Sequence, residues 1–143
     1  MPASTTTADR ELLHRALALA ERGRWTCAPN PMVGALVVRD GVIVGEGFHA
    51  RAGEPHAEIH ALQTAGQRAH GARLYVTLEP CSTHGRTPPC TDAICAAGIA
   101  HVTVGTLDPN PRHAGRGIAL LRQAGIAVTV AHDEPCRTLN EKY

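Results

Sequence analysis

The sequence predicts one α/β domain of three layers, in which a five-stranded mixed sheet lies between two layers of helices. With 143 residues, the chain is long enough for a single domain built around one core. Five short β-rich runs alternate with segments of helical periodicity after an opening helix and hairpin. A hairpin joined to an alternating strand and helix pattern is typical of a mixed sheet covered by helices on both faces.

The chain opens with a polar, Thr-rich segment. Residues 1–7 are expected to be disordered, and residues 8–143 to form the folded domain. The next segment predicts a helix, because its apolar residues recur at helical spacing. Asp9 can cap the start of this helix and Gly23 can end it.

Two β-rich runs follow, at residues 33–38 and 42–48. The dipeptide between them, Asp40-Gly41, favours the positive φ angles of a tight hairpin turn. These runs are therefore expected to pair as an antiparallel hairpin.

Helices and strands alternate through the rest of the chain. A helix from Pro55 to Gly66 is predicted, with His56 in its first turn. Cys81 follows a predicted strand end, and a Pro-Pro pair before Cys90 suits a helix start. The expected strands cover residues 73–78, 101–105 and 126–130, and the expected helices cover 88–98, 117–124 and 134–140.

Composition favours a small substrate and a reducing compartment. The net charge of +1 and the 3% aromatic content argue against an extended nucleic-acid surface, which needs a basic stripe and stacking side chains. No stretch reaches the roughly 20 apolar residues that span a bilayer, so no membrane partner is expected. Five cysteines, an odd number, and no apolar signal segment indicate a cytoplasmic protein without a disulfide framework.

Four residues form the most informative motif: His56, Glu58, Cys81 and Cys90. A catalytic zinc site takes three protein ligands, here one imidazole and two thiolates, and keeps a fourth position for water, whose pKa falls to about 7. Glu58 then needs only to move protons. A His, a non-ligating Glu two residues later, and two cysteines of which the first follows a proline are the signature of hydrolytic zinc deaminases. The motif therefore predicts zinc as cofactor and an enzyme that removes an amino group.

Two other interpretations of the same residues are possible. A closed, purely structural zinc site needs a fourth ligand, and Cys95 or His84 is near enough in the chain to supply it. That site would leave Glu58 without a role. His56 and His60 have the spacing of a zinc protease helix, but the Glu of that pattern directly follows the first His, where this chain has Ala57.

Beyond the zinc motif, further stretches carry a resemblance to a known family. The chain resembles the deaminase domain of the riboflavin biosynthesis protein RibD, a branch of the cytidine deaminase superfamily. This resemblance implies a cytidine-deaminase-like fold. It also implies hydrolysis of 2,5-diamino-6-(5-phosphoribosylamino)pyrimidin-4-one to the uracil derivative and ammonia. The matching stretches are residues 29–34 (PNPMVG), 47–49 (GFH), 53–58 (GEPHAE), 85–90 (GRTPPC), 108–111 (DPNP) and 114–117 (AGRG).

Several residues are candidates for substrate binding. Asn30 stands between two prolines and offers both a donor and an acceptor to a pyrimidinone edge, and His49 ends a strand near the same site. Forked hydrogen bonds to a phosphate need arginine. The candidates are Arg86 together with Arg112 or Arg116, and the resemblance adds Asp108 and Asn110. Each also has a plain alternative as a loop, turn or surface residue.

Two departures from the family keep other functions open. RibD proteins usually have a His where this chain has Thr83, with His84 one residue later, so a substrate contact is changed. Most RibD proteins also continue into a reductase domain, and this chain stops about where the linker would begin. We therefore expect either a stand-alone deaminase, with a separate reductase as a possible partner, or an excised domain. The alternatives are a deaminase of another small amine or, from a different class, a catalytically silent zinc-binding partner of a reductase. A homo-oligomer, dimer or tetramer, is expected because related folds assemble in this way.

Overall fold

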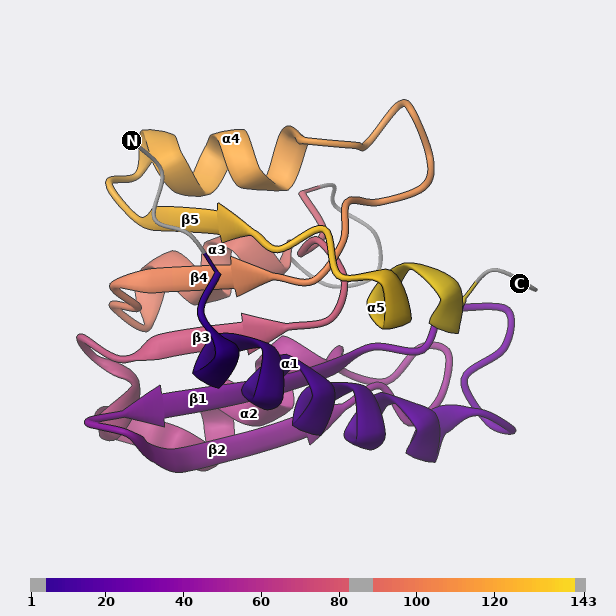
Figure 1. The fold of residues 1–143 in the computed structure, drawn as a ribbon, viewed down its shortest axis with the longest axis horizontal. Helices are drawn as coiled ribbons and strands as arrows, with labels where there is room; N and C mark the ends of the chain where they lie inside the picture. The colour runs from indigo at the N-terminus through magenta and orange to yellow at the C-terminus, as the bar shows by residue number, and fades with distance from the viewer. Residues whose placement is uncertain (1–4, 83–88, 141–143) are drawn as a thin grey trace.

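A five-stranded sheet in the order β2-β1-β3-β4-β5 forms the centre of the protein, which we describe from a computed structural model (Figure 1). The structure describes residues 5–82 and 89–140. The strands are β1 (Gly34–Arg39), β2 (Val42–Phe48), β3 (Arg73–Val76), β4 (His101–Val104) and β5 (Ala127–Val130). The helices are α1 (Thr7–Ala20), α2 (Ala57–Ala65), α3 (Cys90–Ala96), α4 (Arg116–Gln123) and α5 (Glu134–Leu139), with short 3-10 turns at Glu21–Gly23 and Gly66–Ala69.

The sheet is mixed, as predicted. β1 pairs antiparallel with β2 and β3, whereas β3, β4 and β5 run parallel to one another. Helices α1 and α5 lie on one face of the sheet, and α2 and α3 lie on the other (Figure 1). The predicted three-layer α/β/α architecture is confirmed.

Side chains alternate along β1 between two apolar cores. Ala35 and Val37 pack in the core that α2, α3 and α4 share with the sheet. Leu36 and Val38 pack on the opposite face, against α1. Because successive side chains of a strand point to opposite faces, this register buries both faces of the sheet. β1, an interior strand of the sheet, is therefore buried at every position but the last.

The start of α1 differs from the prediction. Thr6 is the N-cap, and its side chain accepts a hydrogen bond from the Asp9 backbone N–H, while the Asp9 side chain accepts one from the Thr6 backbone N–H. This is a capping box, in which the acidic residue stands at the third helical position. Thr6 and Thr7 thus belong to the folded helix start, inside the segment expected to be disordered, and Asp9 completes the cap from within the helix.

The predicted hairpin turn is confirmed. Asp40 and Gly41 have φ angles of 51° and 77°, the left-handed values that a two-residue hairpin turn needs. At the other end of the hairpin, β2 meets α2 backbone to backbone. A Cβ placed on Gly47 would lie 2.4 Å from the Ala57 carbonyl oxygen, so only glycine allows this approach. The contact fixes the N-terminus of α2, where His56 stands, against the sheet.

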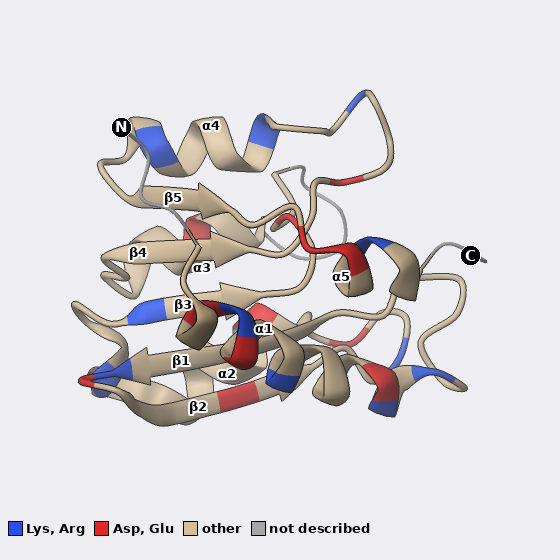
Figure 2. Ribbon diagram, in the orientation of Figure 1, with Lys and Arg blue, Asp and Glu red and all other residues tan. Residues whose placement is uncertain are grey.

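Basic and acidic side chains are mixed along the chain. Figure 2 shows both signs on α1, on β1 and β2, and around the start of α5. Within the described residues, no helix is long and apolar enough to cross a membrane.

Candidate active site

Three predicted metal ligands come together from three separate segments. His56 is the N-cap residue of α2, Cys81 follows β3, and Cys90 is the first residue of α3. The ligand atoms all lie within 4.8 Å of one another. His56 Nδ1 lies 3.2 Å from Cys90 Sγ and 3.7 Å from Cys81 Sγ, and the Cys90 backbone N–H donates to Cys81 Sγ at 3.1 Å.

This donor set fits zinc. One imidazole nitrogen and two sulfurs make up the three protein ligands of an open tetrahedral site. The hydrogen bond between the two thiols lowers the pKa of Cys81 to about 4, with help from His56, and raises the pKa of Cys90. One thiolate is therefore already favoured, which suits a ligand that must lose its proton to bind metal.

The closed structural site receives no support from Cys95. Its side chain is exposed on α3, and it is not part of the ligand group found among the described residues. His84, the other candidate for a fourth ligand, lies outside the described residues.

Glu58 lies beside the ligand group in the first turn of α2 and is only 3% exposed. Burial raises its pKa to about 7, and the negative charge of Cys81 adds to the increase. A carboxyl group with a pKa near the working pH can both take up and release a proton. Glu58 and two ligands, His56 and Cys81, line one pocket of about 210 Å³.

Asn30 and His49 form a fixed pair in the same pocket. His49 is buried, its Nδ1 lies 3.2 Å from the Pro55 carbonyl oxygen, and its Nε2 lies 3.0 Å from Asn30 Nδ2. Nδ1 therefore donates to the carbonyl, and Nε2 accepts from the amide. Desolvation lowers the pKa of His49, which agrees with this neutral form. Its ring meets the ring of His56 edge to face at 5.1 Å between centroids, so the pair supports the ligand as well as the pocket.

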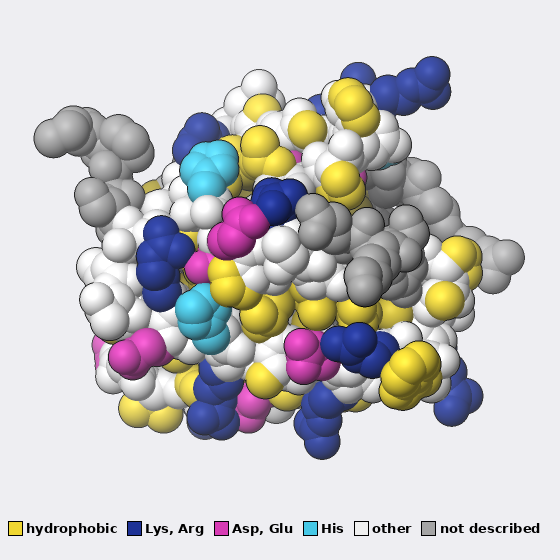
Figure 3. All heavy atoms as spheres, turned by 45° about the vertical axis from the view of Figure 1, so that its right-hand side comes forward, with side chains coloured by type: hydrophobic (Ala, Val, Ile, Leu, Met, Phe, Trp, Pro, Cys, Tyr) yellow, Lys and Arg dark blue, Asp and Glu magenta, His cyan; other side chains and the backbone are white. Residues whose placement is uncertain are grey.

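A larger groove adjoins this pocket. It has a volume of about 540 Å³ and shares Pro31, Leu78 and Asp108 with the pocket. Asn110 and His113 line it from the segment that follows β4. Figure 3 shows the side of the molecule at the right of Figure 1, where hydrophobic side chains gather among histidine and charged side chains. The pocket therefore opens into a space that can take more than a single ring.

The structure places the remaining candidates as follows. Asp108 lines both the pocket and the groove, and Asn110 lines the groove. Arg112 and Arg116 are exposed and line neither space. Three more candidates, Thr83, His84 and Arg86, lie outside the described residues.

Further polar and charged residues at the site were missed from the sequence. Glu79 lines the pocket, and His113, Arg137 and Asn140 line the groove. The position of Glu79, between a predicted strand and the Pro-Cys pair that carries a candidate ligand, is only a weak sign that it belongs to the site. Nothing in the local sequence pattern distinguishes Asn140.

The sheet, the helix that carries His56, and the buried carboxylate define the class of protein: a zinc-binding deaminase. The family model for the cytidine and deoxycytidylate deaminase zinc-binding region matches residues 6–106, more than half of the chain. The chain belongs to this family, and within it to the RibD-type deaminases. It is 63% identical to the riboflavin biosynthesis protein RibD of Escherichia coli over 121 residues, which cover 85% of this chain and 33% of that relative.

A second relative is short. The diaminohydroxyphosphoribosylamino-pyrimidine deaminase of Buchnera aphidicola subsp. Schizaphis graminum is 49% identical over 122 residues, covering 85% of this chain and 83% of the relative. Among solved structures, RibD of Acinetobacter baumannii matches with a TM-score of 0.91 and 46% identity, over 94% of this chain and 38% of that one. The chain thus spans about a third of the length of the RibD relatives it matches.

Proposed function

We propose that the protein deaminates 2,5-diamino-6-(5-phosphoribosylamino)pyrimidin-4-one, giving the 5-aminouracil derivative and ammonia in riboflavin biosynthesis. The observation that carries the proposal is the buried Glu58 beside the ligand group His56, Cys81 and Cys90, in a pocket that opens into a larger groove. A zinc-binding cluster with a proton carrier performs hydrolytic deamination. The adjoining groove suits a ring that bears a sugar phosphate. The short Buchnera relative is a protein named diaminohydroxyphosphoribosylamino-pyrimidine deaminase, which supports the same activity here.

His56, Cys81 and Cys90 would hold the zinc, which would activate a water molecule as a Lewis acid. Glu58 takes a proton from that water and gives it to a ring nitrogen next to the carbon under attack. Once the water oxygen has bonded to that carbon, Glu58 takes up the proton of the resulting hydroxyl group and transfers it to the amino group. The C–N bond then breaks, ammonia leaves and a carbonyl remains. Burial keeps the carboxyl group out of bulk solvent, so protons pass between Glu58 and the substrate.

Recognition of the ring is assigned to Asn30 and His49. Since Asn30 Nδ2 is held by His49, its carbonyl oxygen is left to accept a hydrogen bond from an amino group of the ring. Asp108 and Asn110 are proposed to bind the ribose from the groove. The proposed phosphate ligands are Arg86 with Arg112 or Arg116, and Thr83 and His84 are proposed to contact substrate from the same side as Arg86.

Two features of the wider assembly are also proposed. A solved Thermotoga maritima relative is described as a deaminase joined to a 5-amino-6-(5-phosphoribosylamino)uracil reductase, and it is 46% identical to this chain. A reductase, as a separate protein or a further domain, is the partner that would use the product. We also propose a homo-oligomer and a cytoplasmic location, where thiol ligands stay reduced.

The test is ammonia release by the purified, zinc-loaded protein. The phosphoribosyl compound is compared with its dephosphorylated form and with cytosine, cytidine, guanine and adenosine. We expect fast turnover of the phosphorylated compound alone. If the protein deaminates another of these amines but not the phosphoribosyl compound, the zinc-dependent deamination stands and the proposed substrate is rejected.

The variant Glu58→Gln, which keeps the shape of the side chain, tests the role of Glu58 in proton transfer. The amide cannot carry protons, so we expect ammonia release to fall by at least about 10²-fold. Zinc content, measured by atomic emission, is expected to stay at one per chain because Glu58 is not a ligand. A variant that retains most of its turnover would remove Glu58 from the mechanism.

A further inference from the structure

Glu79 binds four backbone N–H groups with one carboxylate. It lies between β3 and the ligand Cys81 and is 6% exposed. Oε1 accepts from the N–H groups of Asp108 at 3.1 Å and Gly115 at 2.9 Å. Oε2 accepts from those of Gly117 at 3.0 Å and Ile118 at 3.3 Å. Among the described residues, no Lys, Arg or His forms an ion pair with it, so peptide N–H groups alone balance this buried group.

These four bonds hold both ends of one segment. Asp108 lies near the start of the segment that follows β4, and Gly115 to Ile118 end it at the N-cap and in the first turn of α4. Donors in a first helical turn have no partner within the helix, and a carboxylate is favoured there by the helix dipole. Glu79 therefore fastens residues 108–118 directly to the chain that carries Cys81.

The fastened segment is in close contact with the site. A Cβ placed on Gly117 would lie 2.3 Å from the Pro80 carbonyl oxygen, so α4 begins directly against the residue before Cys81. Inside the segment, Asp108 Oδ1 accepts from the Asn110 N–H at 2.9 Å, and Asn110 Oδ1 accepts from the Arg112 N–H at 3.0 Å. The segment is thus internally braced, and its position relative to the ligands depends on Glu79.

We propose that Glu79 is a positioning residue for substrate. It holds residues 108–118 so that Asp108 faces the pocket and Asn110 faces the groove, at the distance from the metal ligands that a ring with a phosphorylated sugar requires. The ligand class is a polyhydroxylated phosphate ester attached to the reacting ring. This inference rests on the proposed function and adds to it the device that sets the spacing between the reaction centre and the sugar phosphate.

The first variant is Glu79→Gln, which has the same shape. Its amide offers one acceptor oxygen and turns an NH₂ group toward two N–H donors, so at least one end of the segment is released. We expect KM for the phosphoribosyl substrate to rise at least tenfold, kcat to change less than threefold, and zinc content to stay at one per chain. The exposed Glu11→Gln on α1 is the matched control and should leave KM and kcat unchanged.

A double-mutant cycle separates positioning from general destabilisation. If Glu79 acts through Asn110, the rise in KM of Glu79→Gln combined with Asn110→Ala is smaller than the product of the two single effects. Independent, multiplicative effects would overturn the proposal. Unchanged KM in Glu79→Gln, or loss of zinc with KM constant, would overturn it as well. Should Glu79→Gln fail to fold, Glu79→Asp keeps the charge with a shorter reach and takes its place in the cycle.

Hydrogen exchange distinguishes this proposal from the proposed function. In Glu79→Gln we expect faster exchange of the amides in 108–118, while α2 keeps its protection. If the wild type does not deaminate the phosphoribosyl compound, the proposed function fails, and KM is compared for the amine it does deaminate. Faster exchange with KM unchanged for that amine would make Glu79 a purely structural anchor and overturn the proposal.

Discussion

At the scale of single residues, Asn140 lines the groove from the C-terminal end of α5 and binds the backbone of Met32. Its Oδ1 accepts from the Met32 N–H at 2.8 Å, and its Nδ2 donates to the Met32 carbonyl oxygen at 2.9 Å. An amide side chain can pair in this way because it carries both a donor and an acceptor. Met32 lies two residues beyond Asn30, whose side chain donates to His49. The two hydrogen bonds from Asn140 to Met32 therefore hold the segment that orients the His49 side chain.

We predict that Asn140→Ala lowers the free energy of unfolding by about 2 kcal/mol, because two hydrogen bonds are lost and backbone groups of Met32 are left unpaired. It should also raise KM, since Asn30 is less firmly held. Urea unfolding and steady-state kinetics measure the two effects. Thr138→Ala, an exposed change on the same helix, is the control, and a variant no less stable than this control would contradict the prediction.

That the candidate metal ligands come together could be predicted, whereas the contacts of Glu79 and Asn140 could not. His56, Glu58, Cys81 and Cys90 stand at spacings that the chemistry itself requires, so their pattern is visible in the chain. Glu79 and Asn140 act on backbone groups 29 to 39 and 108 residues away. Backbone donors and acceptors are the same at every residue, so no sequence pattern marks them as partners.

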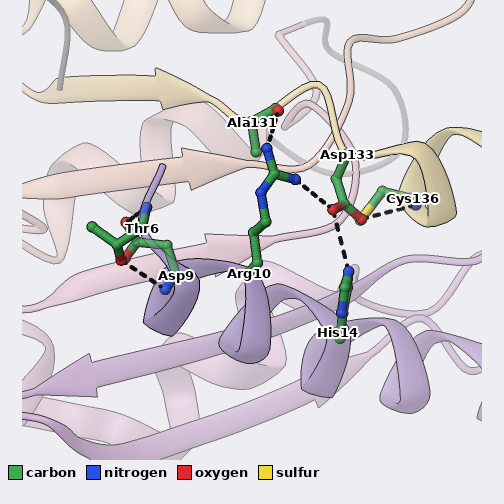
Figure 4. A network of polar contacts seen from close by, with 7 residues as sticks. All are labelled: Thr6, Asp9, Arg10, His14, Ala131, Asp133 and Cys136. Carbon is green, nitrogen blue, oxygen red and sulfur yellow. Dashed lines mark hydrogen bonds and ion pairs between the residues drawn. The ribbon is translucent and has the colours of Figure 1, made fainter. Parts of the chain in front are cut away.

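At the scale of elements, α1 is attached to the end of the sheet by a buried carboxylate. Asp133 is 2% exposed and accepts from Arg10 Nη1 at 2.9 Å and from His14 Nε2 at 3.2 Å, both on α1 (Figure 4). It also caps α5 by accepting from the Cys136 N–H at 3.3 Å. One side chain therefore ties α1 to α5.

This attachment predicts a pH dependence of stability. Burial raises the pKa of Asp133, but the hydrogen bonds from Cys136 and His14 outweigh burial and hold that pKa below its usual value of 3.8. A carboxylate whose pKa is lowered by folding stabilises the protein above 3.8, and the contribution is lost as the pH falls through the folded value.

Asp133→Asn keeps the cap and removes the charge. We expect it to be less stable than the wild type by about 2 kcal/mol at pH 7, since hydrogen bonds to a charged group are lost. The difference should shrink as the pH falls below 3.8. Denaturant unfolding at several pH values measures it, and the comparison cancels any metal release common to both proteins. A difference that stays constant down to pH 2 would contradict the assignment.

Elements were predicted better than their ends. The hairpin and the alternation that follows could be predicted because Asp40-Gly41 and the periodic apolar residues act locally. The start of α1 was predicted wrongly, because Asp9 is a residue type that commonly caps helices. Only the folded backbone shows the reciprocal hydrogen bonds that make Thr6 the N-cap and place Asp9 inside the helix.

At the scale of the whole molecule, the ligand group joins three parts of the chain. His56 comes from the α2 end next to the hairpin, Cys81 from the segment after β3, the strand at the middle of the sheet, and Cys90 from α3, the helix that leads to the parallel half. Metal binding by these residues would therefore crosslink both halves of the sheet and be coupled to folding.

Removal of the metal should lower stability as well as activity. At a free zinc concentration about 1,000 times Kd, binding stabilises by about 4 kcal/mol, which at this chain length corresponds to a fall in Tm of roughly 10 °C on chelation. Differential scanning calorimetry with and without chelator measures the change, and one equivalent of zinc should restore it. Cys95→Ser should behave like the wild type and Cys81→Ser should show no zinc response. A response kept by Cys81→Ser would reject it as a ligand.

The Asp40-Gly41 turn lies at the end of the hairpin away from Gly34 and Phe48, which lead to the pocket segments (Figure 1). A Cβ at Gly41 would meet no atom within 4 Å, although the φ of 77° favours glycine there. A short tag inserted at this turn, with Gly41 kept, would therefore leave the reaction centre facing outward. The turn makes the protein suitable for immobilisation in a defined orientation.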